Sequence, residues 1–258
     1  MNGFKKIVLQ YLFGYLEELI LLLISSFTRK TEKKGKFVIF ARGRSGSTLL
    51  ASFLNHHPEI NCDGEILSHR VAYPENFIRN KCKLSKNKIY GFKLLSYQIR
   101  SIQRIKNPNQ FLRTLHSNGY KIIYLRRENL LRHALSKAYA NYTGKWHSNS
   151  AAKSQIKMTV DNFDLYKSVV ESEKLEKYES SVLENLPHLS LTYEDHLENN
   201  RSHQQTISNL CDFLEIPLAP FSSPLVKLSS NKFDDFVQNT TEMISFFKQT
   251  KYSKYLDQ

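Results

Sequence analysis

Apolar stretches alternate with longer amphipathic ones from residue 36 onward. Short, largely apolar runs predict buried strands at residues 36–41, 88–95, 120–126 and 188–193. Apolar residues at helical spacing predict helices at residues 48–56, 109–118, 129–142, 160–185 and 203–215. Strands and helices that alternate in this way favour a parallel sheet covered on both faces. The sequence therefore predicts an α/β fold, a three-layer, P-loop-type arrangement with a central parallel sheet flanked by helices.

The N-terminal segment has a different pattern. Residues 7–27, "IVLQYLFGYLEELILLLISSF", are strongly apolar and have basic residues on both sides. Glu17 and Glu18 interrupt the run; in the middle of a membrane span each would cost roughly 2–3 kcal/mol, and the uncharged remainder is too short to cross a bilayer. No small-residue cleavage site follows it. Three interpretations remain, in decreasing order of support: a helix on a membrane surface, a helix packed on the domain, and a true anchor.

These patterns predict the domain organisation. Residues 1–35 are expected to form an apolar and basic helix, and residues 36–258 one α/β domain, for which the length is sufficient. Residues 5–30 are the part expected to contact a membrane peripherally. The segment 141–155 is polar and breaks the periodicity, which predicts an active-site loop or a lid.

The charge of the chain points to an anionic partner. Lys and Arg total 37 against 24 Asp and Glu, which gives a net charge of +13. Between Asn76 and Arg127 the sequence has thirteen basic residues and no acidic one. This excess indicates either a solvated basic face or a field focused on one anionic ligand such as a nucleotide, a sulfated substrate, nucleic acid or an acidic membrane.

The cysteines indicate a reducing compartment. Cys62, Cys82 and Cys211 are isolated and odd in number, with neither disulfide nor zinc-ligand spacing. We therefore expect a cytoplasmic protein, at the inner face of a membrane if the N-terminal helix binds one.

The first predicted strand is followed by "RGRSGST". In parallel α/β sheets, ligands bind at the carboxyl ends of strands, where this loop lies. Gly43 and Gly46 allow backbone N–H groups to converge, and the following helix contributes its positive end. Arg44 supplies charge, and the hydroxyl donors are Ser45, Ser47 and Thr48. The pattern favours a phosphate cradle without the Lys of GxxxxGK[ST]; the alternative is a serine-capped helix start with incidental arginines.

A second anion pocket is predicted after the strand at 120–126. That strand ends at Arg126 and Arg127, and in the next helix Arg132 and Ser136 share one face. Nucleotide-triphosphate enzymes place a magnesium-binding acid at such a strand end, whereas arginines there would repel a metal. Two anion pockets without metal ligands suit a nucleotide with phosphates at two positions.

At this point several segments resemble one family. They resemble successive motifs of the sulfotransferase superfamily, in particular its bacterial carbohydrate branch with the nodulation-factor and glycolipid enzymes: "RGRSGSTLLASFLNHHPEINCDGEIL", "IYGFKLL", "IIYLRRENLLRHALS" and "LTYEDHLENNRSHQQTISNLCDFLEIP". The resemblance extends from about Lys36 to the C-terminus. It implies 3′-phosphoadenosine 5′-phosphosulfate (PAPS) as donor, a carbohydrate or glycolipid hydroxyl as acceptor, and in-line transfer without a metal.

The resemblance also implies roles in donor binding. The residues that resemble the 5′-phosphosulfate loop are Arg44, Ser45, Gly46, Ser47 and Thr48. Arg127 and Ser136 resemble the pair that holds the 3′-phosphate, but their spacing is one residue longer than in the cytosolic branch, so Arg126 remains a competitor. Lys232, with residues 227–231, resembles the C-terminal loop that closes over the nucleotide.

Other residues are candidates for the acceptor side. Glu65 in "CDGEIL" is the expected catalytic base, with Asp63 as a competitor and the capping of a short helix at 66–72 as the structural alternative. Lys93 steadies the sulfuryl oxygens unless it is an ordinary edge lysine. In the polar loop, Trp146 and His147 are expected to contact the acceptor sugar; simple anchoring of the loop is equally compatible with Trp146.

Two other functions compete with sulfuryl transfer. "LTYED" is compatible with a strand that ends in metal-binding acids, which keeps a P-loop kinase as an alternative. The basic excess is compatible with a non-catalytic protein that binds a membrane surface or nucleic acid. We expect the enzyme, without nucleic acid as a partner; the sequence leaves the oligomeric state open.

Overall fold

The computed structural model describes residues 3–28, 33–144, 156–219 and 232–256, with side chains from residue 12 onward. Trp146, His147 and residues 227–231 lie outside the described residues.

A parallel sheet of five strands forms the centre of the described domain. Its strands are β1 (Gly35–Ala41), β2 (Ile60–Glu65), β3 (Ile89–Leu95), β4 (Tyr120–Arg126) and β5 (Leu189–Thr192), in the order β2-β3-β1-β4-β5. The predicted α/β fold with a central parallel sheet is confirmed. The four predicted strands match β1, β3, β4 and β5. The sequence pattern predicts no strand at β2, whose residues "INCDGE" are largely polar.

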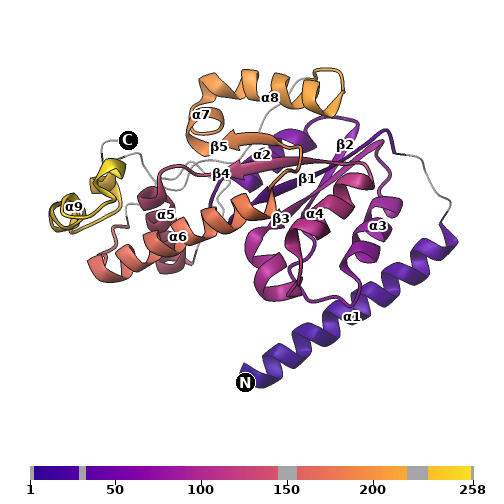
Figure 1. Cartoon of the computed structure of the whole chain (residues 1–258), viewed down its shortest axis with the longest axis horizontal. Helices are drawn as coiled ribbons and strands as arrows, with labels where there is room; N and C mark the ends of the chain where they lie inside the picture. The colour runs from indigo at the N-terminus through magenta and orange to yellow at the C-terminus, as the bar shows by residue number, and fades with distance from the viewer. Residues whose placement is uncertain (1–2, 29–32, 145–155, 220–231, 257–258) are drawn as a thin grey trace.

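Helices account for most of the remaining described chain (Figure 1). They are α1 (Gly3–Phe27), α2 (Ser47–Asn55), α3 (Pro74–Leu84), α4 (Pro108–Ser117), α5 (Leu130–Thr143), α6 (Asn162–Val182), α7 (Tyr193–His196), α8 (Asn200–Leu214) and α9 (Thr240–Lys248). Shorter helical turns occur at Gln98–Gln103, Phe233–Asp235 and Ser253–Tyr255. The short helix at 66–72, on which the capping alternative for Glu65 depends, does not form, because these residues adopt turns, bends and irregular structure.

Side chains that alternate along β1 build two core layers. Phe37 and Ile39 pack with residues of α2 and α8 on one face of the sheet. Val38 and Phe40 pack with residues of α3 and α4 on the other. All four of these side chains are fully buried. Because helices cover both faces of the sheet, the sequence of β1 is a continuous apolar run and does not alternate between apolar and polar residues.

A third apolar cluster joins the C-terminal part to α5 and α6. It contains Leu135 of α5, Val169 of α6 and Met243 of α9. Figure 1 shows α5, α6 and α9 together at one side of the sheet. Helix α5 follows β4 in the chain, and this cluster fixes the helix that carries Ser136.

Helix α1 contacts α3 and lies along the outside of the domain (Figure 1). Of the helices in the described ranges, none combines the length and apolar character needed to cross a bilayer.

Candidate active site

The loop between β1 and α2 adopts the backbone conformation of an anion cradle. Arg44 and Gly46 both have positive φ angles, 67° and 88°. Such a conformation is unfavourable for a residue with a Cβ, and strained residues of this kind cluster at functional sites. A Cβ at Gly46 would lie 2.7 Å from Cδ2 of Tyr193. The position therefore requires glycine for both its backbone angle and its close contact.

Two serines of this loop are buried beneath it. Ser45 and Ser47 are 0% and 5% exposed, and α2 begins at Ser47. Within the part of the chain that the structure describes, the hydroxyl of Ser45 has no hydrogen-bond partner. A buried hydroxyl without a partner costs free energy. A phosphate group at the start of α2 would supply an acceptor at a point that the helix end also favours.

The two predicted anion pockets lie together. Nε and Nη2 of Arg44 donate to Oγ of Ser136 over 3.2 and 3.1 Å. Arg127 is 5% exposed, and its guanidinium lies 4.7 Å from the centre of the Tyr193 ring. Its Nε is 3.7 Å from Oε1 of Glu194 and has no hydrogen-bond partner among the described residues. The loop after β1 and the end of β4 thus share one buried, cationic region.

The guanidinium group of Arg127 repels two others in this region, those of Arg44 and Arg132. Burial and the neighbouring Arg127 both lower the pKa of Arg44. Burial also lowers the pKa of Arg132, where Arg127 acts in the same direction and Glu198 opposes it. Like charges brought together in a buried place are unfavourable unless an anion compensates them. The electrostatics therefore favour a strongly anionic ligand.

Arg126 is turned toward carboxylates. Its Nη2 lies 2.8 Å from Oε1 of Glu128, and its Nη1 lies 3.7 Å from Oε1 of Glu176. Of the two competing arginines, Arg127 is the one next to Arg44 and Tyr193. This placement favours Arg127 as the ligand of an anion.

Lys93 connects the cradle to the expected base. It is 5% exposed, and its Nζ donates to Oγ1 of Thr48 over 2.9 Å and lies 3.4 Å from Oε1 of Glu65. Its strand, β3, is an interior strand between β2 and β1. The alternative of an ordinary edge lysine is therefore wrong.

Glu65 is the last residue of β2. Tyr97 donates from Oη to Oε2 of Glu65 over 3.0 Å, and Gln98 donates to the same oxygen over 3.4 Å. Burial together with Glu65 raises the pKa of Tyr97 to about 12, so its phenol stays protonated and donates. Two side-chain donors thus fix the position of the Glu65 carboxylate. Because no helix forms at 66–72, the alternative role of Glu65 as a helix cap does not apply.

A bulge in β2 separates Glu65 from its competitor Asp63. The pairing of β2 with β3 shifts between these residues, so that Asp63 opposes Phe92 and Glu65 opposes Lys93. Asp63 accepts from Oη of Tyr90 over 2.9 Å. Residues two apart in a regular strand point to the same face, and a bulge reverses this. The extra residue therefore aims Glu65, and not Asp63, at Lys93.

A buried charge network that the sequence analysis missed fixes the start of the cradle. Arg42 is 1% exposed, and its Nε donates to Oε2 of Glu179 over 3.1 Å. Ser96 and Tyr124 donate to the same carboxylate over 2.8 and 3.0 Å. One carboxylate from α6 thereby binds a strand residue of β4 and the residues that directly follow β1 and β3. The only sequence signal was an arginine directly after an apolar run; its partner lies far away in the chain.

His133 holds the next residue of the loop. Its Nε2 lies 2.7 Å from the carbonyl oxygen of Gly43, and its Nδ1 lies 2.9 Å from Oγ of Ser172. Burial, assisted by Arg42, lowers the pKa of His133 to about 3. The ring is therefore neutral near pH 7, donates from Nε2 to Gly43 and accepts at Nδ1.

The lowered pKa predicts a pH-dependent stability. Below its ordinary pKa of about 6.5, the unfolded chain protonates His133 whereas the folded protein does not. The contribution of the neutral His133 to the free energy of unfolding is thus fully present above pH 6.5 and is lost as the pH falls toward 3. We expect the free energy of unfolding of wild type to exceed that of His133→Gln at pH 7, and the gap to narrow by about 1–2 kcal/mol by pH 5. Urea unfolding of both proteins at several pH values measures it; a constant gap would contradict the neutral, buried ring.

The acids of "LTYED" have structural partners. Glu194 accepts from the backbone N–H groups of Glu128 and Asn129 over 3.0 and 3.2 Å. Asp195 accepts from Oγ1 of Thr192 over 2.8 Å. Both carboxylates thus stabilise local backbone turns, which weakens the interpretation of this segment as a metal-binding strand end. Among the described residues, no three or more His, Cys, Asp or Glu side chains lie together in a way that could hold a metal ion.

Lys232 lies at the edge of the same region. It is exposed and directly precedes Phe233, whose ring lies 4.6 Å from the guanidinium carbon of Arg132. Trp146 and His147 are not described, so their proximity to the site stays a prediction.

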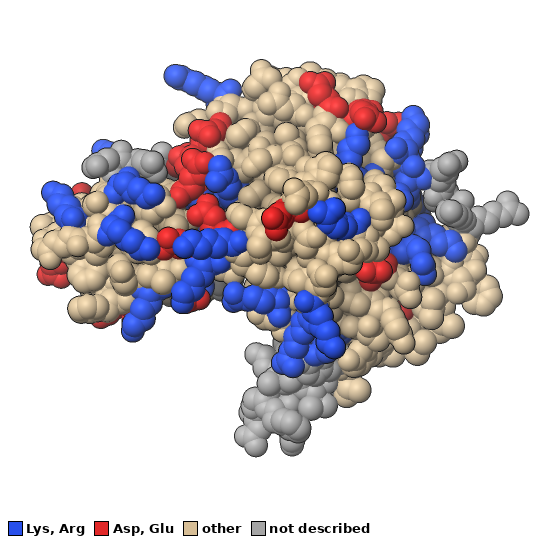
Figure 2. All heavy atoms as spheres, viewed as in Figure 1, with Lys and Arg blue, Asp and Glu red and all other residues tan. Residues whose placement is uncertain are grey.

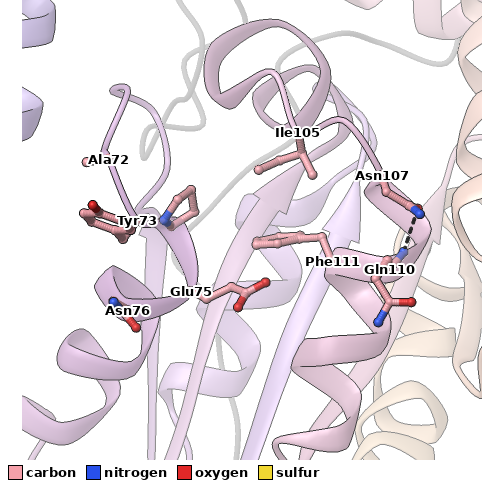
Figure 3. Close-up of a pocket in the computed structure, with 9 residues that line it drawn as sticks. Ala72, Tyr73, Glu75, Asn76, Ile105, Asn107, Gln110 and Phe111 are labelled. Atoms are coloured by element: carbon pink, nitrogen blue, oxygen red, sulfur yellow. Dashed lines mark hydrogen bonds between the residues drawn. The ribbon is translucent and has the colours of Figure 1, made fainter.

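A separate pocket lies between the first turns of α3 and α4 (Figure 3). Its volume is about 310 Å³, and its polar lining residues include Tyr73, Glu75, Asn107 and Gln110. Both helices begin at the carboxyl edge of the sheet, the edge at which Glu65 also lies. The pocket therefore opens on the side of the sheet where ligands of α/β proteins bind.

Comparisons with known proteins add little to what the geometry of the site shows. No protein-family model matches the chain, and a comparison with curated proteins finds no match. Among solved structures, the chain is similar to that of mouse sulfotransferase SULT7A1 complexed with PAP, at 15% sequence identity and a TM-score of 0.47. That match covers 92% of this chain and 72% of the other.

Proposed function

We propose that this protein is a sulfotransferase that moves a sulfuryl group from PAPS to a hydroxyl of a carbohydrate or glycolipid. The observation that carries the proposal is the union of two anion pockets: Arg44 of the loop after β1 contacts Ser136, beside Arg127 at the end of β4. A donor with phosphates at two positions offers a ligand for both at once.

The residues fit the donor at particular atoms. The loop from Arg44 to Thr48 would hold the 5′-phosphosulfate, where Ser45 has a buried hydroxyl without a partner among the described residues. Arg127 and Ser136 would hold the 3′-phosphate. Nε of Arg127 is a buried donor that has no hydrogen-bond partner among the described residues. Fixed cations and N–H groups stabilise charge without reorganisation, which is compatible with transfer that uses no metal.

Glu65 is suited to accept the proton of the acceptor. In the proposed reaction the acceptor oxygen forms a bond to sulfur while the bond from sulfur to the bridging phosphate oxygen breaks. The electron pair stays on the phosphate of adenosine 3′,5′-bisphosphate, and the hydroxyl proton passes to Glu65. Lys93 lies between Thr48 and Glu65, a position from which its ammonium can neutralise the transferring oxygens.

The acceptor is proposed from the resemblance and from the pocket between α3 and α4. Tyr73, Asn107 and Gln110 offer phenol and amide groups at its surface, which suit the hydroxyls of a sugar. This pocket shares the carboxyl edge of the sheet with Glu65 and can be reached from solvent.

Binding and transfer measurements test the proposed function. We expect adenosine 3′,5′-bisphosphate to bind equally well with and without magnesium in calorimetry, and labelled sulfate to pass from PAPS to oligosaccharides or glycolipids. Tight binding of Mg-ATP with no binding of the bisphosphate would instead favour the kinase.

A matched pair of variants tests the 3′-phosphate site. Arg127→Gln should weaken the binding of adenosine 3′,5′-bisphosphate by at least about 30-fold, since losing a buried charged partner costs about 2–5 kcal/mol. Arg126→Gln removes an arginine that already has two carboxylate neighbours and should change the affinity by less than about threefold. Calorimetric titration of both proteins measures this, and equal losses would refute the assignment of Arg127.

A further inference from the structure

The outer surface of α1 is the largest apolar feature of the described chain. Ten of the sixteen exposed large hydrophobic side chains among the described residues belong to this one helix. Globular proteins seldom expose apolar side chains in such a contiguous group unless the surface meets a partner or a membrane. The proposed chemistry does not use this surface.

The inner face of α1 is defined by its contacts with the domain. Gly14, Leu21 and Ser25 are buried there, and a Cβ at Gly14 would lie 2.1 Å from the carbonyl oxygen of Arg70. This close approach needs the absence of a side chain. The helix is therefore docked in one rotational orientation.

Both glutamates of the helix belong to this inner side. Oε1 of Glu17 lies 2.9 Å from Nζ of Lys81. The two carboxylate oxygens of Glu18 accept from the backbone N–H groups of Ala72 and Tyr73, each over 2.7 Å. The carboxylates of Glu17 and Glu18 thus bind groups of the domain and do not lie on the outer face of α1.

The opposite stripe is wholly apolar. With 100° between successive residues, the side chains that point away from Gly14 and Leu21 are Leu12, Leu16, Leu19, Leu23 and Phe27. Their exposed fractions are 60%, 56%, 53%, 54% and 90%. Helix and domain together form an amphipathic unit, in which the domain replaces the polar face of an isolated interfacial helix.

Charge at both ends of the helix favours an anionic partner. The sequence has Lys5 and Lys6 near its start and Arg29, Lys30, Lys33 and Lys34 after its end. Pairing of α1 with a second copy, whether parallel or antiparallel, would bring these cationic ends together. Anionic lipid headgroups would neutralise them while acyl chains cover the apolar stripe. Figure 2 shows Lys and Arg near the end of α1 at the right of the view, beside a largely uncharged surface.

We propose that α1 lies in the surface of an anionic bilayer, with Leu12, Leu16, Leu19, Leu23 and Phe27 directed toward the acyl chains and Glu17 and Glu18 kept on the domain. This contact is independent of the proposed reaction. It would hold the enzyme at a membrane without a spanning segment.

Vesicle co-sedimentation of the full chain tests this contact. We expect it to sediment with vesicles of phosphatidylcholine and phosphatidylglycerol, and at least tenfold more weakly with vesicles of phosphatidylcholine alone or at high salt. The double variant Leu16→Glu/Leu23→Glu should bind the mixed vesicles at least tenfold more weakly than wild type. Leu218→Glu, the same substitution at a residue that is 54% exposed outside α1, should bind like wild type.

Thermal unfolding and light scattering complete the test. The double variant should keep the unfolding temperature of wild type, because both leucines are exposed. Wild-type protein that stays in the supernatant, or a double variant that binds as well as wild type, overturns the proposal. A third outcome also overturns the proposal: wild type is a dimer that does not bind vesicles, and the double variant is a monomer. That result would assign the apolar stripe to contact with a second copy of the chain.

Discussion

Glu65→Gln should lower the turnover number of sulfuryl transfer by about 10²–10⁴-fold, the range over which a positioned general base accelerates such reactions. The amide keeps the shape of the carboxylate and can still accept from Oη of Tyr97, which now lies 3.0 Å away. What it loses is the capacity to take the acceptor proton. Because Glu65 does not contact the proposed donor site directly, the affinity for adenosine 3′,5′-bisphosphate should remain unchanged.

Asp63→Asn is the matched control for this variant. Asp63 lies two residues away in the same strand, but it accepts from Tyr90 and Asn61 on the other side of the bulge. Its substitution should change turnover by less than about tenfold. Initial rates with labelled PAPS and calorimetry with the bisphosphate separate the two effects. A parallel fall of rate and donor affinity in Glu65→Gln would assign Glu65 to binding, and a larger loss in Asp63→Asn would exchange the two roles.

Arg42→Met should produce the largest loss of stability. Removal of one partner from a buried ion pair typically costs about 3–5 kcal/mol, because the remaining charge is left without compensation. Here the remaining charge is the carboxylate of Glu179, which is 0% exposed. The hydroxyls of Ser96 and Tyr124 would still donate to it but carry no positive charge. A fall in Tm of about 6–20 °C follows for a protein of this size.

Two further variants make this stability test specific. Arg126→Met removes a half-buried arginine with carboxylate neighbours at 2.8 and 3.7 Å, and surface pairs of this kind contribute about 0–1 kcal/mol. The double variant Arg42→Met/Glu179→Leu should be more stable than Arg42→Met, since it removes the uncompensated charge. Calorimetric unfolding compares all four proteins. If Arg42→Met loses no more than Arg126→Met, the network is not the stabilising element described above.

The sequence predicts those parts of the fold that depend on local pattern. Strands β1 and β4 are continuous apolar runs, and the loop after β1 has the Gly and Ser residues of an anion cradle. The two strands and the loop can therefore be located from the sequence. The pairing of Arg44 with Ser136 follows from the adjacency of these two strands. The face of α5 that carries Ser136 was readable from the spacing of its residues.

Other parts depend on contacts that no local pattern encodes. Strand β2 lies at the edge of the sheet. In its six residues only Ile60 and Cys62 are apolar, so the alternation is too short to predict a strand. The bulge that turns Glu65 toward Lys93 is a matter of register with β3, which the sequence of β2 alone does not specify. The contact between Arg42 and Glu179 joins residues 137 positions apart. The docking of α1 depends on the carbonyl group of Arg70 and on helix α3, neither of which is visible from its hydropathy.

The order of the strands separates the two halves of the proposed chemistry. The arginines proposed to hold the donor follow β1 and β4 in the interior of the sheet, whereas the carboxylate proposed to activate the acceptor is at the end of β2, at the edge of the sheet. A marginal strand has neighbours on one side only, so the chain that follows it can change in length and composition without repacking the centre. We therefore expect related enzymes to diversify in the molecules they modify by altering the segment between β2 and α3, while the machinery that handles the nucleotide stays constant.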